Sequence, residues 1–264
     1  MKKGAMFDSR GQVTIFIILG IIIVAAGLLV YSFYPQIKST ISTTEENPPS
    51  YIQSCVESDL KSAIDKVSIQ GGSINPDNNS LLYQNNKIEY LCYTNEYYRS
   101  CVVQQPMLME HIESELKNAI QNTVDSCFNS MKDSYQKKGY DVTLTPGDEN
   151  VYLLPQKISA VFNYTAVLTK GGSTDRYDSF SVSLNNNLYD FVTIANSIIA
   201  YEAVYGTAET TTYMTYYHNL KVEKILRDFD GKVYIITDRD TGDKFQFASR
   251  SQMWPPGIET PKTS

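Results

Sequence analysis

The chain has 264 residues, of which 42% are apolar, 20% charged and 12% aromatic, with 20 Tyr and a single Trp. These values exclude a disordered protein, a collagen, a coiled-coil rod and a small disulfide scaffold. The formal net charge is −6, and removing Lys2, Lys3, Arg10 and Asp8 leaves 20 basic and 28 acidic residues, or −8, for residues 35–264. This acidic remainder shows no basic patch, so we expect no nucleic-acid partner.

The first predicted element is an N-terminal membrane anchor. Residues 13–31 read VTIFIILGIIIVAAGLLVY, and this uncharged run extends to Tyr34. At 1.5 Å per residue such a run crosses a hydrocarbon layer of about 30 Å, and its backbone must be helical. Basic residues precede the run, which predicts a cytoplasmic stub or leader (1–11), a transmembrane helix (12–34) in contact with membrane lipid, and extracytoplasmic residues 35–264.

A processing signal precedes the apolar run. Residues 9–14 read SRGQVT, with a basic residue and a Gly directly before the hydrophobic segment. This motif resembles the class III signal of archaeal type IV pilins, which a prepilin-type peptidase cuts after the Gly. The resemblance implies cleavage between Gly11 and Gln12, with the helix kept on the mature protein. Phe16 stands where many pilins carry Glu, and a plain anchor that is never cut stays an open alternative.

A second resemblance concerns the predicted extracytoplasmic residues 35–264. A Cys-bearing helix runs from Cys55 to the Gly71-Gly72 turn, and another is centred on Cys127. This pattern resembles uncharacterised archaeal membrane-anchored surface proteins with a KKGQ-type start. The resemblance implies an extracytoplasmic domain and no known activity.

The next elements are a linker and an amphipathic helix. Residues 35–50 are rich in Ser, Thr, Glu and Pro, which predicts a linker between the membrane and the domain. Apolar side chains with helical spacing predict a helix over residues 51–67, and Gly71-Gly72 ends it. A polar loop then leads to a short hairpin around residues 87–93 and 100–103.

A second helix and two hairpins follow. Pro106 opens a helix with a long apolar stripe, and Gly139 marks its end. Period-two alternation predicts one strand over residues 158–168, paired through the Gly171-Gly172 turn with a strand over 180–184. A helix near residues 188–205 and a Thr/Tyr-rich stretch come next. The last pattern is a hairpin of residues 232–237 and 244–248.

This order predicts an α+β fold with a mainly antiparallel sheet. The extracytoplasmic domain is expected over residues 51–254, with a flexible tail over 255–264. No internal repeat of fixed period occurs in the sequence.

All four cysteines lie on the predicted outer side, which favours two disulfides. We favour Cys92–Cys101, because both flank one tight turn, and Cys55–Cys127, because each lies on or beside the apolar stripe of its helix. Free buried thiols and a zinc site are the alternatives, but the chain has no Cys-x-x-Cys pair, so no metal is expected. The triplets at Asn78 and Asn163 satisfy the Asn-x-Ser/Thr pattern and predict glycosylation.

Catalytic motifs are scarce. His111 adjoins an apolar stripe and is expected to pack, and His218 has no nucleophile motif beside it. The triplet Asp240-Thr241-Gly242 matches the aspartic protease signature, but such chemistry needs two carboxylates in an apolar setting, so a hairpin turn is the favoured interpretation. Calcium held by Asp238, Asp240 and Asp243 is a weaker alternative, because the spacing departs from known loops.

Tyrosines form two clusters, which interfaces favour because Tyr combines contact area with low entropy cost. The first holds Tyr93, Tyr97 and Tyr98, and the second holds Tyr201, Tyr205, Tyr213, Tyr216 and Tyr217. We expect a single-pass surface protein with a non-enzymatic structural or interaction domain, no cofactor, and a surface-protein or homo-oligomeric partner. The alternatives are a pilin-like filament subunit processed after Gly11 and, remotely, an anchored hydrolase that uses Asp240.

Overall fold

A computed structural model describes the chain at residues 20, 23–24, 47–77, 79–227 and 231–251. Its contacts divide the chain into Met1–Asn47 and Pro48–Ser264, and the fold below is that of the second unit. The predicted stub, cleavage site and tail residues 252–264 lie outside the described residues, as does nearly all of the predicted anchor and linker. Within the described part, no helix is long and apolar enough to cross a membrane.

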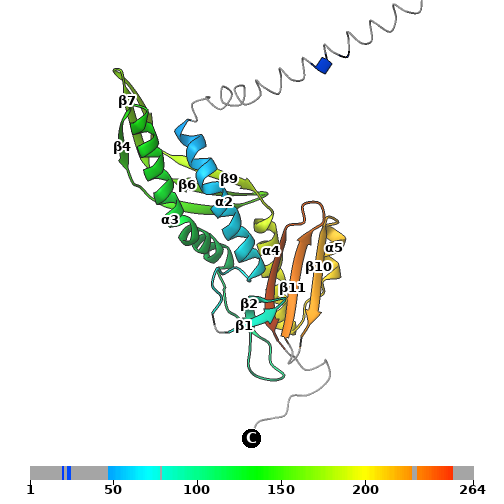
Figure 1. The fold of residues 1–264 in the computed structure, drawn as a ribbon. Coiled ribbons are helices and arrows are strands. Elements are labelled where there is room, and N and C mark those ends of the chain that lie inside the picture. The colour runs from blue at the N-terminus through cyan, green and yellow to red at the C-terminus, as the bar shows by residue number, and fades with distance from the viewer. Residues whose placement is uncertain (1–19, 21–22, 25–46, 78, 228–230, 252–264) are drawn as a thin grey trace, which may run out of the picture. The chain divides into compact units, whose positions relative to one another are not determined.

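Two long helices, α2 (Pro48–Ile69) and α3 (Leu108–Lys137), pack against each other (Figure 1). Each buries the apolar stripe that its sequence predicts, from Ile52 to Val67 in α2 and from Leu108 to Met131 in α3. The predicted linker is too long at its end, because residues 48–50 belong to α2. Proline suits the first turn of a helix, since amide groups there have no intrahelical acceptor.

The disulfide Cys55–Cys127 joins these two helices, with the Cα atoms 5.9 Å apart. The second disulfide, Cys92–Cys101, closes a loop between two strands. Both pairs are those favoured from the sequence. The described residues contain no free cysteine.

The strands form three sheets, and the fold is α+β with mainly antiparallel pairing, as predicted. One sheet has the order β1-β2-β12-β11-β10 with β3 beside β2, and the others are β4-β7-β8 and β5-β6-β9. The strands are β1 (Ser80–Tyr83), β2 (Asn86–Tyr93), β3 (Val102–Val103), β4 (Asp141–Thr145), β5 (Glu149–Leu154), β6 (Lys157–Phe162), β7 (Thr165–Lys170), β8 (Ser173–Tyr177), β9 (Phe180–Asn185), β10 (Leu220–Leu226), β11 (Gly231–Asp238) and β12 (Lys244–Arg250).

The single strand predicted over residues 158–168 is wrong, because the segment forms β6 and β7 in two different sheets. Asn163 and Tyr164 link them, and the Tyr164 ring stacks on Phe128 of α3 at 4.1 Å. Phe162, Tyr164 and Ala166 are all buried, so the apolar alternation runs through the link without a visible break. The predicted hairpin through the Gly171-Gly172 turn is therefore also different. This turn joins β7 to β8, whereas β9 pairs with β6.

The C-terminal sheet carries α4 (Leu188–Tyr205) and the short α5 (Thr211–Tyr216). The hairpin β11–β12 forms where the sequence predicted it. β12 also pairs in parallel with β2, which brings the last strand beside the Cys92–Cys101 loop. The Cys101 amide donates to Ser251 Oγ at 3.0 Å. In this way the first and last strands of the domain share one sheet.

A partly buried hydrogen-bond cluster joins α3 to β5 and to the link after β6. The Tyr164 hydroxyl lies 2.8 Å from Asp125 Oδ1 and 2.9 Å from Glu149 Oε1. One hydroxyl donates only one hydrogen, so the second contact is satisfied best by a protonated carboxyl. Glu149 is 8% exposed and its Oε2 has no partner in the described structure. Burial therefore raises the pKa of Glu149, although its bond to Tyr164 acts in the opposite direction.

We expect Glu149→Gln to stabilise the domain at neutral pH by about 1 kcal/mol, because it removes a buried, incompletely paired carboxylate. A raised carboxyl pKa means that the folded state binds the extra proton, so stability falls as pH rises from the unfolded pKa through the folded one. Thermal unfolding across this window should show a smaller pH dependence in the variant. Glu57→Gln, at an exposed position of α2, is the control and should leave the wild-type profile unchanged.

Candidate binding site

A cavity of about 490 Å³ lies between α4, α5 and β10, and tyrosine dominates its lining. It is larger than a cavity beside Asp238 (about 290 Å³) and one beside Asp65 (about 250 Å³). We call it the tyrosine pocket. Its lining residues are Ser197, Tyr201, Tyr205, Thr207, Ala208, Glu209, Thr212, Tyr213, Tyr216, Tyr217 and Lys224. The five tyrosines are those of the second cluster in the sequence.

Helical spacing aligns one wall of the pocket. Ser197, Tyr201 and Tyr205 recur every four residues on α4 and therefore share one face. The rings of Tyr201 and Tyr205 have centroids 5.8 Å apart. Gly206 ends the helix with a left-handed φ of 72°, which turns the chain toward α5.

The short helix α5 forms the opposite wall. Its Tyr213 hydroxyl lies 2.8 Å from Ser197 Oγ, which ties α5 to α4. Burial raises the pKa of Tyr213, so this phenol stays neutral at physiological pH. Tyr205 and Tyr216 are 63% and 78% exposed. One tyrosine thus anchors the wall, while others present their rings to solvent.

The two charged residues of the pocket already have partners within it. Lys224 Nζ donates to Thr207 Oγ1 at 3.0 Å and to the Ala208 carbonyl at 2.9 Å. The Glu209 carboxylate accepts bonds from the amide and hydroxyl of Thr211, which lower its pKa. These bonds hold the segment between α4 and α5. The surface offered to a ligand is therefore aromatic faces and phenol hydroxyls, with little unpaired charge.

A buried polar network joins the last turn of α4, next to the pocket, to strands β11 and β12. Glu202 of α4 is fully buried and bonds to Lys232 Nζ at 2.8 Å, to Ser249 Oγ at 2.9 Å and to the Tyr234 hydroxyl. The Ala208 amide in turn donates to the Tyr234 hydroxyl at 3.4 Å. Burial and the adjacent Glu202 carboxylate raise the pKa of Tyr234. This network fixes the last turn of α4 on the sheet and so positions Tyr205.

The first tyrosine cluster is arranged differently. The Arg250 guanidinium lies over the rings of Tyr93 and Tyr97, at 5.9 and 5.5 Å from their centroids. Tyr97 and Tyr98 are exposed on the loop that Cys92–Cys101 closes. Cation–π stacking thus already covers part of this cluster.

Asp240 lies in the turn between β11 and β12, where it is exposed. Asp238 holds this turn by accepting the amides of Asp240 and Thr241 at Oδ1. Its Oδ2 accepts the side-chain amides of Asn187 and Asn219 at 3.0 and 2.9 Å. Burial raises the pKa of Asp238, but these hydrogen bonds together lower it by more. The pKa of Asp238 therefore lies below its ordinary value. This geometry supports a hairpin turn and gives Asp240 no apolar, proton-sharing setting.

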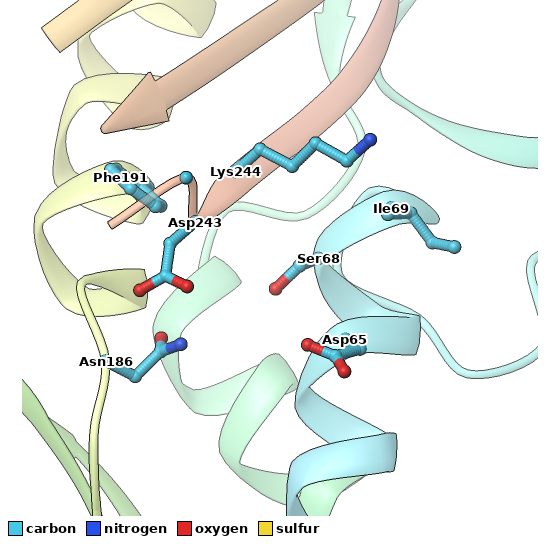
Figure 2. Close-up of a pocket in the computed structure, with 8 residues that line it drawn as sticks. Asp65, Ser68, Ile69, Asn186, Phe191, Asp243 and Lys244 are labelled. Carbon is cyan, nitrogen blue, oxygen red and sulfur yellow. The ribbon is translucent and has the colours of Figure 1, made fainter. Parts of the chain in front are cut away.

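A smaller cavity beside this turn has both polar and apolar residues in its lining. In Figure 2 the carboxylates of Asp65 and Asp243 point toward the cavity with Ser68, whereas Lys244 points away. Of the other two acids of the calcium alternative, Asp238 accepts hydrogen bonds from amide groups and Asp240 is exposed in the turn. No group of three or more His, Cys, Asp or Glu side chains that suits a metal occurs among the described residues.

The remaining predicted residues lie apart from the pocket or at its margin. His111 is half-buried, with Nε2 2.8 Å from Ser73 Oγ, and Ser73 also donates to the buried Glu89. Because Ser73 is itself buried, this chain of bonds is structural. His218 is exposed beside Tyr217.

The two glycosylation triplets have different positions. Asn78 lies outside the described residues. Asn163 is exposed in the link between β6 and β7, so its predicted place within a strand is wrong.

Compared with protein-family models, curated proteins and solved structures, the chain matches none of them.

Proposed function

We propose that this chain is a single-pass, membrane-anchored surface protein whose α+β domain binds a partner outside the membrane through the tyrosine pocket. The observation that carries the proposal is the pocket itself, with five tyrosines on α4, on α5 and directly after α5, four of which are more than half exposed. Exposed aromatic rings around a concavity are typical of interaction sites, because their burial by a partner is favourable and costs little entropy. The two disulfides suit an oxidising compartment.

The absence of free charge in the pocket favours binding over catalysis. Lys224 and Glu209 are engaged by their neighbours, and Tyr213 is kept neutral by burial. None of these groups has the paired base or nucleophile that acid–base or covalent chemistry needs. A partner with apolar or aromatic side chains and a few hydrogen-bonding groups fits this surface.

The proposal predicts that pocket tyrosines control binding of the purified full-length chain to envelope fractions of its host cells. We expect Tyr205→Ala with Tyr216→Ala to weaken retention at least about tenfold, the loss typical of interface tyrosines. Tyr152→Ala, at an exposed tyrosine of β5 away from the pocket, is the matched control and should bind as wild type. Equal retention of the pocket variant and the control would contradict the proposal.

Location and processing have separate tests. A membrane-impermeant amine reagent should label lysines of residues 48–251 on intact cells, and labelling only after lysis would contradict an external domain.

N-terminal sequencing decides the processing proposal at Gly11 and Gln12. A mature N-terminus at Gln12, with the chain recovered from sheared fibres, would replace the anchored protein by a filament subunit.

A further inference from the structure

The described chain ends beside the tyrosine pocket. Ser251 is buried and its Oγ donates to the Glu202 carbonyl at 2.9 Å. Lys232 Nζ bonds both to the Ser251 carbonyl at 3.0 Å and to the carbonyl of Gly206. These bonds fix the start of the C-terminal tail, residues 252–264, at the last turn of α4.

The tail is long enough to enter the pocket from this point. Tyr205 follows Glu202 by three residues, about 4.5 Å along the helix axis. An extended chain spans about 3.3–3.6 Å per residue, so Trp254 can lie up to about 11 Å from Ser251 and Pro256 up to about 18 Å. The pocket wall at the end of α4, with Tyr205, therefore falls within reach of these residues.

The composition of the tail matches the lining. It begins Gln252-Met253-Trp254-Pro255-Pro256, which combines the only Trp of the chain with two consecutive prolines. Proline-rich segments adopt an extended conformation before binding and dock in grooves lined by aromatic rings. A pocket of about 490 Å³ with exposed tyrosine faces provides such a groove.

The other tyrosine cluster also lies near the tail, since Arg250 directly precedes Ser251. The Arg250 guanidinium lies over the rings of Tyr93 and Tyr97, although Tyr97 is still 60% exposed. The tyrosine pocket combines the exposed side chains of Tyr205 and Tyr216 with a cavity of about 490 Å³ that can enclose an aromatic ring. This difference favours the pocket as the docking site.

We propose that Trp254-Pro255-Pro256 docks in the tyrosine pocket of its own chain and competes there with the outside partner. The inference rests on the proposed function, because it makes the tail the regulator of that same site. Docking in the same chain has the advantage of a short tether, which raises the effective concentration of the tail at the pocket.

Trp254 reports its own environment, because no other Trp contributes to the fluorescence of the full-length chain in detergent. We expect wild-type emission at shorter wavelength, and slower quenching by acrylamide, than in Tyr205→Ala or Tyr216→Ala. Losing one aromatic contact of about 0.5–1.5 kcal/mol should reduce the docking constant about two- to twelvefold. Tyr152→Ala should leave emission and quenching unchanged, and dilution should not alter the wild-type signal.

Three results would overturn the inference. One is wild-type quenching equal to that of a free peptide of residues 252–261. Another is a change in Tyr97→Ala as large as that in Tyr205→Ala, which would place the tail on the first cluster. The third is a signal that is lost on dilution, which would show docking between chains.

Envelope binding separates this inference from the proposed function. Trp254→Ser should increase retention of the full-length chain on envelopes, because the pocket is then open. An exposed Trp254 with Tyr205-dependent envelope binding would remove the tail proposal and leave the function standing. A protected Trp254 with envelope binding independent of Tyr205 would remove the proposed function and leave tail docking standing.

Discussion

Replacing Glu202 by Gln is expected to lower the free energy of unfolding by about 3–5 kcal/mol, because it leaves the buried Lys232 ammonium without its counter-charge. The pair is almost completely shielded from water, with side-chain exposures of 0% and 10%. Glu202 also accepts hydrogen bonds from Ser249 and Tyr234. The substitution therefore weakens the contacts of α4 with both β11 and β12. Urea unfolding followed by circular dichroism measures the change.

A double-mutant cycle tests the cause of this loss. Lys232→Met alone should be as costly as Glu202→Gln, since it leaves a buried carboxylate unpaired. The double variant should lose much less than the sum of the two, because neither charge is then isolated. Additive losses would show that the pair does not act as a unit. Lys221→Met is the control, because its pair with Glu223 is open to solvent, with side-chain exposures of 51% and 38%, and it should change stability by less than about 1 kcal/mol.

The second large effect concerns the disulfides, which close loops of very different length. Cys55 and Cys127 are 72 residues apart, whereas Cys92 and Cys101 are nine apart. The loop-entropy relation gives losses of about 4.4 and 2.6 kcal/mol on their removal. We therefore expect Cys55→Ser with Cys127→Ser to lower the unfolding midpoint more than Cys92→Ser with Cys101→Ser.

Urea titrations of both double variants, each with the other disulfide intact, measure this difference. Equal losses would contradict an effect through the unfolded chain. A larger loss from the short loop would point to packing instead, since Cys92 and Cys101 are also buried at the junction of β2 and β12.

Local patterns predicted the helices and the disulfides well. The apolar stripes of α2 and α3 place Cys55 and Cys127 toward each other, and the short segment between Cys92 and Cys101 permits one turn. The sequence could not separate β6 from β7, because Tyr164 keeps the inward alternation across the link. The parallel pairing of β2 with β12 depends on residues about 150 apart in the chain, for which no local signal exists.

The tyrosine pocket was partly predictable. Clustering of tyrosines in the sequence identified Tyr201 and Tyr216 as interface candidates, but both clusters had equal standing there. The packing of α5 against α4 makes the second cluster concave, and the Arg250 guanidinium lies over two rings of the first cluster; neither arrangement can be read from the sequence. Lys224 was not expected, because β10 brings it to the pocket from a separate element.

Photo-crosslinking in intact cells tests the central claim most directly. A photoreactive phenylalanine derivative replaces Tyr216 in the pocket or, as the matched control, Tyr152 on β5. Both chains also carry Trp254→Ser, so that the pocket is open whether or not the tail docks. The proposed function predicts a crosslinked species larger than the chain from position 216, absent from position 152 and lost when Tyr205→Ala is added. Only uncrosslinked chain from position 216, or equal yields from both positions, would contradict it.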